Sequence, residues 1–197
     1  MAARGNANNK KSQAGQLRIV AGNWRGRLLV VADLPGLRPT SERIRETLFN
    51  WLAPRINGAK CLDLCAGTGA LGIEAMSRGA ASAVFVENSP VAVKTLTANL
   101  ASLGSAGTEV LHIDARTFLR GRHELTFDVV FLDPPFAADM LSELCRLLSA
   151  RDWLSADARI YLELDRKQPE PDLPPAWQVL KNKTAGRVRY MLATAEA

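Results

Sequence analysis

The tetrapeptide Asp133-Pro134-Pro135-Phe136, whose residue types could do chemistry, follows directly on the apolar run 129–132. An exocyclic amine on a planar base is a poor nucleophile, because its lone pair is delocalised into the ring. The Asp133 carboxylate and the Pro134 carbonyl are acceptors that can hold the N–H bonds of such an amine and localise its lone pair. Phe136 can stack on the base. The tetrapeptide predicts a reacting centre that works by orientation and electrostatics, although Asp and Pro also favour plain turns.

A glycine-rich loop is the second feature of this kind. Gly67 and Gly69 allow the backbone to turn sharply and to approach a ligand closely. With Gly72 they also satisfy the GxGxxG pattern of dinucleotide-binding proteins, and Glu87 follows 18 residues after Gly69. Asp63 favours S-adenosylmethionine over a dinucleotide, because a carboxylate suits the ammonium group of that cofactor and would repel a pyrophosphate. A purely structural role for Asp63, as a cap of the loop, is the alternative.

Two acidic residues at the ends of later apolar runs complete the predicted cofactor site. Glu87 can accept hydrogen bonds from both hydroxyls of a ribose. Asp114 can accept from the adenine amino group, with the Ala115 amide as a donor to the ring, or it can cap the helix that begins at Ala115. The cofactor-binding residues that we predict are Asp63, Cys65, Ala66, Gly67, Thr68, Gly69, Glu87, Asn88, Asp114 and Ala115.

The elements that must position these residues alternate between strand and helix. Short apolar runs separated by helical patterns are typical of parallel strands buried on both faces. A fifth strand and a closing hairpin with its turn at Thr184-Ala185-Gly186 follow them. The strands are expected at 61–64, 83–86, 110–113, 129–132, 159–164, 177–180 and 188–192. This order predicts an α/β fold with a seven-stranded, mostly parallel sheet and one antiparallel strand near its edge, where ligands bind at the carboxyl ends of the strands.

The charge of the chain is divided unevenly. Residues 1–60 hold 11 Lys and Arg against 3 Asp and Glu, whereas residues 61–197 hold 14 against 17. The front is therefore +8 and the remainder −3. Such a division is typical of a basic arm that meets a polyanion beside a module that does chemistry, although a solubilising tail would give the same charge.

The front of the chain has its own predicted elements. Residues 1–15 lack apolar mass and are expected to form a flexible basic tail. The runs 17–20 and 27–31 flank a glycine-rich turn and predict a hairpin. Thr40 is predicted as the N-cap of a helix that Pro54 closes. We therefore divide the chain into the tail at 1–15, an arm of hairpin and helix at 16–55, and a catalytic domain at 56–197.

Several classes of protein are disfavoured by what the sequence lacks. Its three cysteines, Cys61, Cys65 and Cys145, show no metal-ligand spacing, so reduced thiols are expected and no metal site is predicted. No apolar leader or membrane-spanning run is recognisable, which predicts a cytoplasmic protein without a membrane partner.

These motifs together resemble the bacterial class I methyltransferases that modify guanine N2 in 16S ribosomal RNA. The likeness extends from residue 17 to about residue 192. Many methyltransferases share the loop and the tetrapeptide, and the front of the chain is the narrower signature. Cys65 stands where phenylalanine is usual in this family and Thr68 where serine is usual. The segments that carry the likeness are Arg18-Ile19-Val20-Ala21-Gly22, Trp24-Arg25-Gly26-Arg27, Arg38-Pro39-Thr40 and the loop that runs from Asp63 to Ala75.

The resemblance implies a Rossmann-like sandwich, S-adenosylmethionine as cofactor, a monomer, and a substrate of 16S rRNA within a partly or fully assembled 30S subunit with its ribosomal proteins. The arm would then contact RNA phosphates, and Trp24 would stack on an unpaired base or pack on the body of the protein. A second basic patch is expected at the closing hairpin, from Lys181, Lys183, Arg187 and Arg189. The predicted RNA-binding residues are Arg18, Trp24, Arg25, Arg27, Arg38, Arg43 and Arg45.

Four alternatives stay open at this point. A methyltransferase for adenine N6 would often carry a target-recognition insertion, which 197 residues barely accommodate. A methyltransferase for a protein glutamine amide would carry Asn where this chain has Asp133. An NAD-dependent oxidoreductase leaves the Asp-Pro-Pro-Phe segment unexplained. A non-catalytic RNA-binding module predicts the basic arm but no intact cofactor loop.

Overall fold

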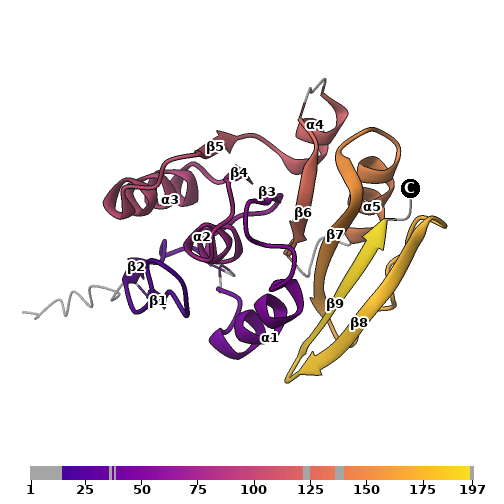
Figure 1. The fold of residues 1–197 in the computed structure, drawn as a ribbon, viewed down its shortest axis with the longest axis horizontal. Coiled ribbons are helices and arrows are strands. Elements are labelled where there is room, and N and C mark those ends of the chain that lie inside the picture. Colours follow the sequence, from indigo (N-terminus) through magenta and orange to yellow (C-terminus); the bar gives the residue numbers. More distant parts are fainter. Residues whose placement is uncertain (1–14, 36, 38, 122–124, 136–139, 196–197) are drawn as a thin grey trace, which may run out of the picture.

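Seven strands form one mixed sheet in the order β5-β4-β3-β6-β7-β9-β8 in the computed structural model, which describes residues 15–35, 37, 39–121, 125–135 and 140–195 (Figure 1). Strands β3 to β7 run parallel, and β9 is antiparallel to both of its neighbours. The predicted sheet is thereby confirmed, with β9 as the antiparallel strand next to the edge. The strands are β3 (Lys60–Asp63), β4 (Ser82–Glu87), β5 (Thr108–His112), β6 (Phe127–Leu132), β7 (Leu154–Asp165), β8 (Trp177–Ala185) and β9 (Val188–Ala195).

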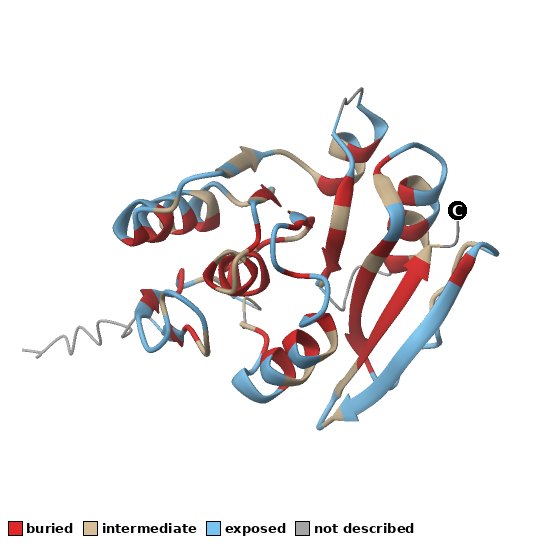
Figure 2. Cartoon of the chain, viewed as in Figure 1, coloured by how far each residue is buried: buried red, intermediate tan, exposed pale blue. Residues whose placement is uncertain are grey.

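Helices cover both faces of this sheet. Alternate strand residues, such as Cys61 and Leu62 in β3, belong to two different apolar cores. The first core packs under α1 (Glu42–Leu52), α2 (Ala70–Ser77) and α3 (Pro90–Leu103), and the second under α4 (Ala115–Arg120) and α5 (Leu141–Ser149). The central strands are therefore buried on both sides, whereas β8 at the edge is mostly exposed (Figure 2). Burial on both faces explains why the sequence of the central strands is almost continuously apolar.

The carboxyl ends of β3 and β6 meet at the point where the strand order reverses. Strand β3 is paired with β4 on one side and with β6 on the other, and the chain winds outward from there in both directions. A crevice at such a reversal is the usual ligand site of an open parallel sheet. The glycine loop follows β3 and the Asp133 segment follows β6, so both lie at this reversal point, where the crevice is expected.

The predicted hairpin at the front of the chain is present as β1 (Gln16–Arg18) and β2 (Leu28–Val30), an antiparallel pair. It does not stand apart from the body of the protein. Leu17, Ile19, Leu29 and Val31 are buried in the same core as α1 and α2. The arm and the sheet are therefore one packed unit.

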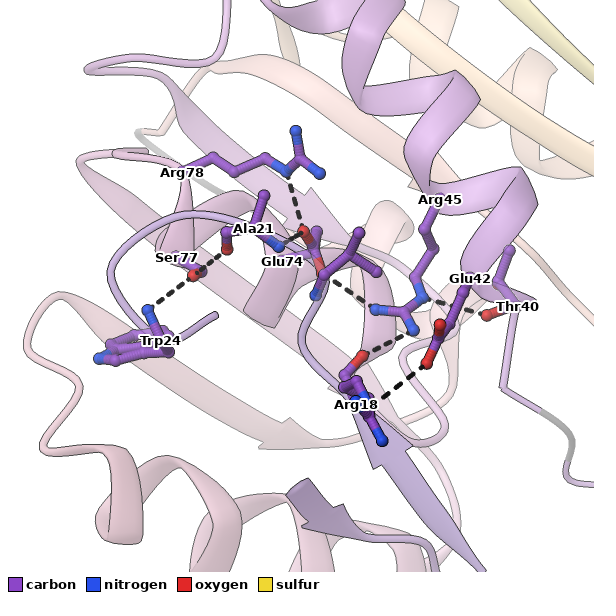
Figure 3. A network of polar contacts seen from close by, with 10 residues as sticks. Arg18, Ala21, Trp24, Thr40, Glu42, Arg45, Glu74, Ser77 and Arg78 are labelled. Carbon is purple, nitrogen blue, oxygen red and sulfur yellow. Dashed lines mark hydrogen bonds and ion pairs between the residues drawn. The ribbon is translucent and has the colours of Figure 1, made fainter. Parts of the chain in front are cut away.

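A buried carboxylate fastens the hairpin to α2 (Figure 3). Glu74 is fully buried, and its oxygens accept from the amides of Val20 and Ala21, both at 2.9 Å. The same carboxylate is 3.0 Å from Nη1 of Arg45 and 2.9 Å from Nε of Arg78. A buried carboxylate needs such partners, because an unpaired one would lose its hydration without compensation.

Arg45 completes this network, in a position that differs from its predicted place on the RNA-binding surface. Its side chain is 1% exposed, so it is not part of a basic RNA-binding surface. Besides Glu74, it donates to the carbonyls of Arg18 at 2.8 Å and Thr40 at 3.1 Å. The residues at 45, 48, 49 and 52 share one buried face of α1, and this helical spacing is why Arg45 points inward.

The start of α1 also differs from the prediction by one residue. Ser41 is the N-cap, and its hydroxyl accepts from the Ile44 amide. Thr40 is buried instead, and its side chain turns toward the carboxyl end of β6. The predicted end of the helix before Pro54 is confirmed.

Candidate active site

The glycine loop after β3 is shaped by backbone conformations that side chains disfavour. Gly67 has a φ of +52° and Gly69 a φ of +74°, in the left-handed region. A Cβ at Gly69 would lie 2.4 Å from a methyl group of Leu96, so the loop also packs too tightly there for a side chain. The predicted sharp turn is thereby confirmed.

Asp63 lies beneath this loop and caps it. Its Oδ2 accepts from the Gly72 amide at 2.9 Å, and the residue is 2% exposed. Burial raises the pKa of Asp63 to about 7, and the negative charges of Asp133 and Glu87 add to this rise while the Gly72 hydrogen bond opposes it. The structural interpretation of Asp63 is therefore confirmed, and a contact with a cofactor stays a prediction.

Glu87 joins the loop to the end of β4. Its Oε2 accepts from the Gly67 amide and its Oε1 from the Ser89 amide, both at 2.7 Å. The side chain is half-buried at the end of β4. Asn88, the next residue, is exposed, and its carbonyl is 3.0 Å from Nε2 of His112.

Asp114 follows the end of β5, just as Asp63 and Glu87 lie at the ends of β3 and β4. Its Oδ1 accepts from the amides of Arg116 and Thr117 at 3.1 and 3.0 Å, so it is the N-cap of α4. The capping alternative is confirmed, and the predicted contact with an adenine stays a prediction. Ala115 is buried directly behind it.

Asp133 stands at the end of β6, in the crevice. Thr40 Oγ1 donates to its Oδ2 over 3.1 Å. Burial raises the pKa of Asp133 to about 6, although the Thr40 hydrogen bond lowers it. Pro134 is buried and Pro135 exposed, and Phe136 lies outside the described residues. At neutral pH, Asp133 is an ionised acceptor held in place by a residue from the front of the chain.

Sequence reasoning missed a second carboxyl group beside Asp133. Glu163 of β7 is 5% exposed, and the buried Tyr161 hydroxyl donates to its Oε2 over 2.6 Å. Strands β6 and β7 pair Leu132 with Leu162, so the next residue of each strand is Asp133 and Glu163. The signal was in the sequence: a glutamate inside an otherwise apolar run is costly to bury without a partner.

A cleft borders the same segment. Its volume is about 300 Å³, and it is lined by Pro134, Pro135, Leu141, Glu163 and Gln168, among others. The two prolines that follow Asp133 and the second carboxyl group, Glu163, thus line one open space.

The basic residues of the front divide into exposed and engaged ones. Arg25 and Arg43 are exposed. Arg18 is exposed but lies 4.0 Å from Glu42, and Arg27 is exposed and donates to the Ser102 carbonyl at 2.8 Å. Arg38 lies outside the described residues.

The remaining predicted RNA contacts are Trp24 and the basic residues of the closing hairpin. Trp24 is partly buried against the first core, and its amide donates to Ser77 (Figure 3). Lys181 and Lys183 are exposed on β8, with Lys183 5.7 Å above the Trp51 ring. The other two residues of that patch, Arg187 and Arg189, form ion pairs with Asp165 and Glu170.

Over the described ranges, none of the helices is both long and apolar enough to cross a membrane. Those same ranges hold no group of three or more His, Cys, Asp or Glu that could bind a metal ion.

The order of the sheet, the glycine loop after β3 and the Asp-Pro-Pro segment after β6 are those of the class I methyltransferase fold. The family model described as "Conserved hypothetical protein 95" matches residues 17–194, and the chain belongs to this family.

Two named relatives match nearly the whole chain. "Ribosomal RNA small subunit methyltransferase D" of Escherichia coli (strain K12) is 46% identical over 186 residues, which cover 94% of this chain and 93% of that one. The protein of the same name from Haemophilus influenzae is 44% identical over 181 residues, covering 90% and 93%.

Solved structures agree with this family. The Escherichia coli protein described as "Putative methyltransferase yhhF" has a TM-score of 0.87 and 43% identity, covering 93% of this chain and 99% of its own. The Haemophilus influenzae protein described as "putative methylase HI0767" has a TM-score of 0.81 and 39% identity, covering 93% of this chain and all of its own. The fold described above is therefore the fold of the family.

Proposed function

We propose that this protein transfers a methyl group from S-adenosylmethionine to the exocyclic N2 amine of a guanine in the 16S RNA of the small ribosomal subunit. Methylation of ribosomal RNA is the activity that the names of its relatives state. The observation that carries the chemistry is Asp133, an ionised acceptor that Thr40 holds at the reversal point of the sheet. A partly or fully assembled 30S subunit is the proposed form of the substrate.

The charge around the glycine loop fits a cationic cofactor. Burial raises the pKa of the Cys65 thiol, and the negative charges of four carboxylates raise it further. Such a field attracts a sulfonium and an ammonium group but repels the pyrophosphate of a dinucleotide. This is the observation that favours S-adenosylmethionine over NAD. The four carboxylates are Asp63, Asp133, Glu87 and Asp114.

Each predicted cofactor residue has a task in this proposal. When bound, S-adenosylmethionine supplies an electrophilic methyl group. Glu87 receives the ribose hydroxyls, and Asp114 with the Ala115 amide receives the adenine. Asp63 contributes its charge from beneath the loop, and Gly67 lets the backbone approach the cofactor. Cys65, Ala66, Thr68, Gly69 and Asn88 complete the proposed lining.

Asp133 and Pro134 act on the target amine. The side-chain oxygen of Asp133 and the backbone oxygen of Pro134 accept hydrogen bonds from its two N–H groups. These hydrogen bonds localise the lone pair of the nitrogen and direct it toward the methyl group. The nitrogen must lose a proton when its new bond to carbon forms, and the Asp133 carboxylate is the proposed acceptor. The cleft beside Pro134 and Pro135 offers space for the flipped base, and Phe136 is proposed to stack on it.

The RNA-binding surface is proposed from the exposed basic residues. Arg18, Arg25, Arg27 and Arg43 surround the hairpin and α1, and Arg38 belongs to the same segment. Contacts from such residues to phosphates give affinity without sequence specificity. Lys181 and Lys183 on β8 would extend this surface on the far side of the crevice. Trp24 is assigned to packing on the protein body.

Two experiments test the proposal. Calorimetry with the purified protein is expected to show binding of S-adenosylmethionine and none of NAD; tight binding of NAD would overturn the cofactor. Methylation of small-subunit particles purified from cells that lack the enzyme, followed by nucleoside mass spectrometry, is expected to yield N2-methylguanosine. Formation of N6-methyladenosine, or of methylated protein alone, would replace the guanine assignment by one of its rivals.

A further inference from the structure

Glu163 has no task in the reaction described so far, yet its position is costly. The side chain is 5% exposed and lies between Leu162 and Leu164, which are themselves buried. A carboxyl group in such surroundings must be neutral or well partnered. Among the described residues of β7 that reach the crevice, it is the carboxyl group next in register to Asp133.

Among the described residues, polar groups from several elements surround Glu163. Tyr161 from β7 donates to Oε2 over 2.6 Å, and Thr40, ahead of α1, hydrogen-bonds to both Glu163 and Asp133. From the other side, β9 places Tyr190 opposite Glu163 in the strand register. The titratable groups that face Glu163 are therefore Asp133, Tyr161 and Tyr190.

Two carboxyl groups this close share their protons unequally. Burial raises the pKa of Glu163 to about 8, and the charge of Asp133 adds to the rise, whereas the hydrogen bonds with Tyr161 and Thr40 oppose it. The pKa of Asp133 is raised to about 6. Between these two values the pair holds one proton, which resides on Glu163, and one negative charge, which resides on Asp133.

We propose that Glu163 is a positioning residue for methyl transfer: as a neutral group it holds, together with Thr40, the charged Asp133 carboxylate toward the target amine. Ionised Glu163 would remove a proton donor from the set and place a second anion against Asp133, which moves that carboxylate away from its position. The inference rests on the proposed methyl transfer but not on which base is the target.

The pH dependence of kcat tests this role, because a merely structural glutamate would leave it unchanged. Wild-type kcat is expected to fall above pH 8, by about tenfold per pH unit once Glu163 is ionised. Glu163→Gln stays neutral and keeps a donor, so it should retain near-wild-type kcat at pH 7 and lose the fall that Glu163 causes. Its acid limb near pH 6 should not move, since Glu163 is already neutral there.

Tyr161→Phe provides an independent variant that preserves the ring. Its hydroxyl lowers the pKa of Glu163, so removing it should move the alkaline limb to higher pH. The guanine ring itself titrates at high pH, and comparison of the three proteins on one substrate cancels that contribution. Identical alkaline limbs in all three proteins, or an inactive Glu163→Gln protein that still binds cofactor, would overturn the proposal.

A spectroscopic measurement separates this inference from the proposed function. Infrared difference spectra of the protein without substrate should show a protonated-carboxyl band at pH 7 that Glu163→Gln removes. Absence of that difference contradicts the neutral state of Glu163 whatever the substrate is. Its presence in a protein that fails to methylate RNA would leave the proton assignment intact and refute the substrate.

Discussion

Replacing Arg45 by alanine is expected to destabilise the whole protein, because it removes one of the two cations that pair with the fully buried Glu74 carboxylate. Glu74 would lose its partner at 3.0 Å, and the carbonyls of Arg18 and Thr40 would lose their donors. Removing one partner of a buried ion pair costs about 3–5 kcal/mol.

The lower end of that range applies here, because three donors to Glu74 survive. The amides of Val20 and Ala21 and the Arg78 side chain still reach its oxygens. We therefore expect a loss of about 3 kcal/mol in the free energy of unfolding. For a chain of this length, that corresponds to a fall of about 6–12 °C in Tm.

Urea denaturation followed by circular dichroism measures this loss, with differential scanning calorimetry for Tm. Arg43→Ala is the matched control, because Arg43 is exposed on the same helix and should change stability by no more than about 0.5 kcal/mol. Arg45→Lys should fall between the two, since an ammonium cannot reproduce the fork of three contacts. A loss below about 1 kcal/mol in Arg45→Ala, typical of an exposed ion pair, would refute the role of this network.

Three further outcomes are expected. Thr40→Val removes the hydrogen bond that lowers the pKa of Asp133, so the acid limb of kcat should move above pH 6, whereas Thr40→Ser should retain it; an unmoved limb in Thr40→Val would contradict this. Gly69→Ala should weaken cofactor binding in calorimetry more than Gly104→Ala, which shares a positive φ but has open space. Lys183→Glu should lower RNA affinity and its salt dependence without affecting cofactor binding; unchanged affinity would remove β8 from the interface.

The sequence was sufficient to predict the sheet and the residues at its carboxyl edge. Continuous apolar runs indicate strands buried on both faces, and the antiparallel hairpin at the end places β9 next to the edge. The residues of the crevice follow from the fold, because every parallel strand ends at the same edge. The order of strands is what brings the loop after β3 next to Asp133.

The sequence did not reveal which polar residues point into the interior of the protein. Arg45 looked like part of a basic surface, although its spacing with Leu48 and Leu52 places it on the buried face of α1. Thr40 looked like a cap, and one residue of shift gave that task to Ser41. Glu163 was read as part of a strand. The partners of Arg45 and Thr40 lie far along the chain, so single-sequence reasoning has no access to those pairings. The hydrogen-bond partner of Glu163 is only two residues away, but its neighbour Asp133 comes from another strand.

The sequence also did not reveal how closely the front arm packs on the rest of the protein. Its charge and its short strands favoured an arm distinct from the catalytic domain. The hydrophobic residues of the same strands instead complete the core under α1 and α2, and Glu74 binds the backbone between them. The segment proposed to meet RNA therefore also fixes Thr40, and through it Asp133.

Single-turnover methylation of small-subunit particles tests the central claim most directly, with wild type compared with Asp133→Ala and the remote control Asp152→Ala. Asp152 is exposed and precedes β7, so it lies near the amino end of that strand, whereas Glu163 lies near its carboxyl end. Wild type and control are predicted to form N2-methylguanosine at the same rate, and Asp133→Ala to form none while binding S-adenosylmethionine normally. N2-methylguanosine formed by Asp133→Ala at the wild-type rate would contradict the proposed reacting centre.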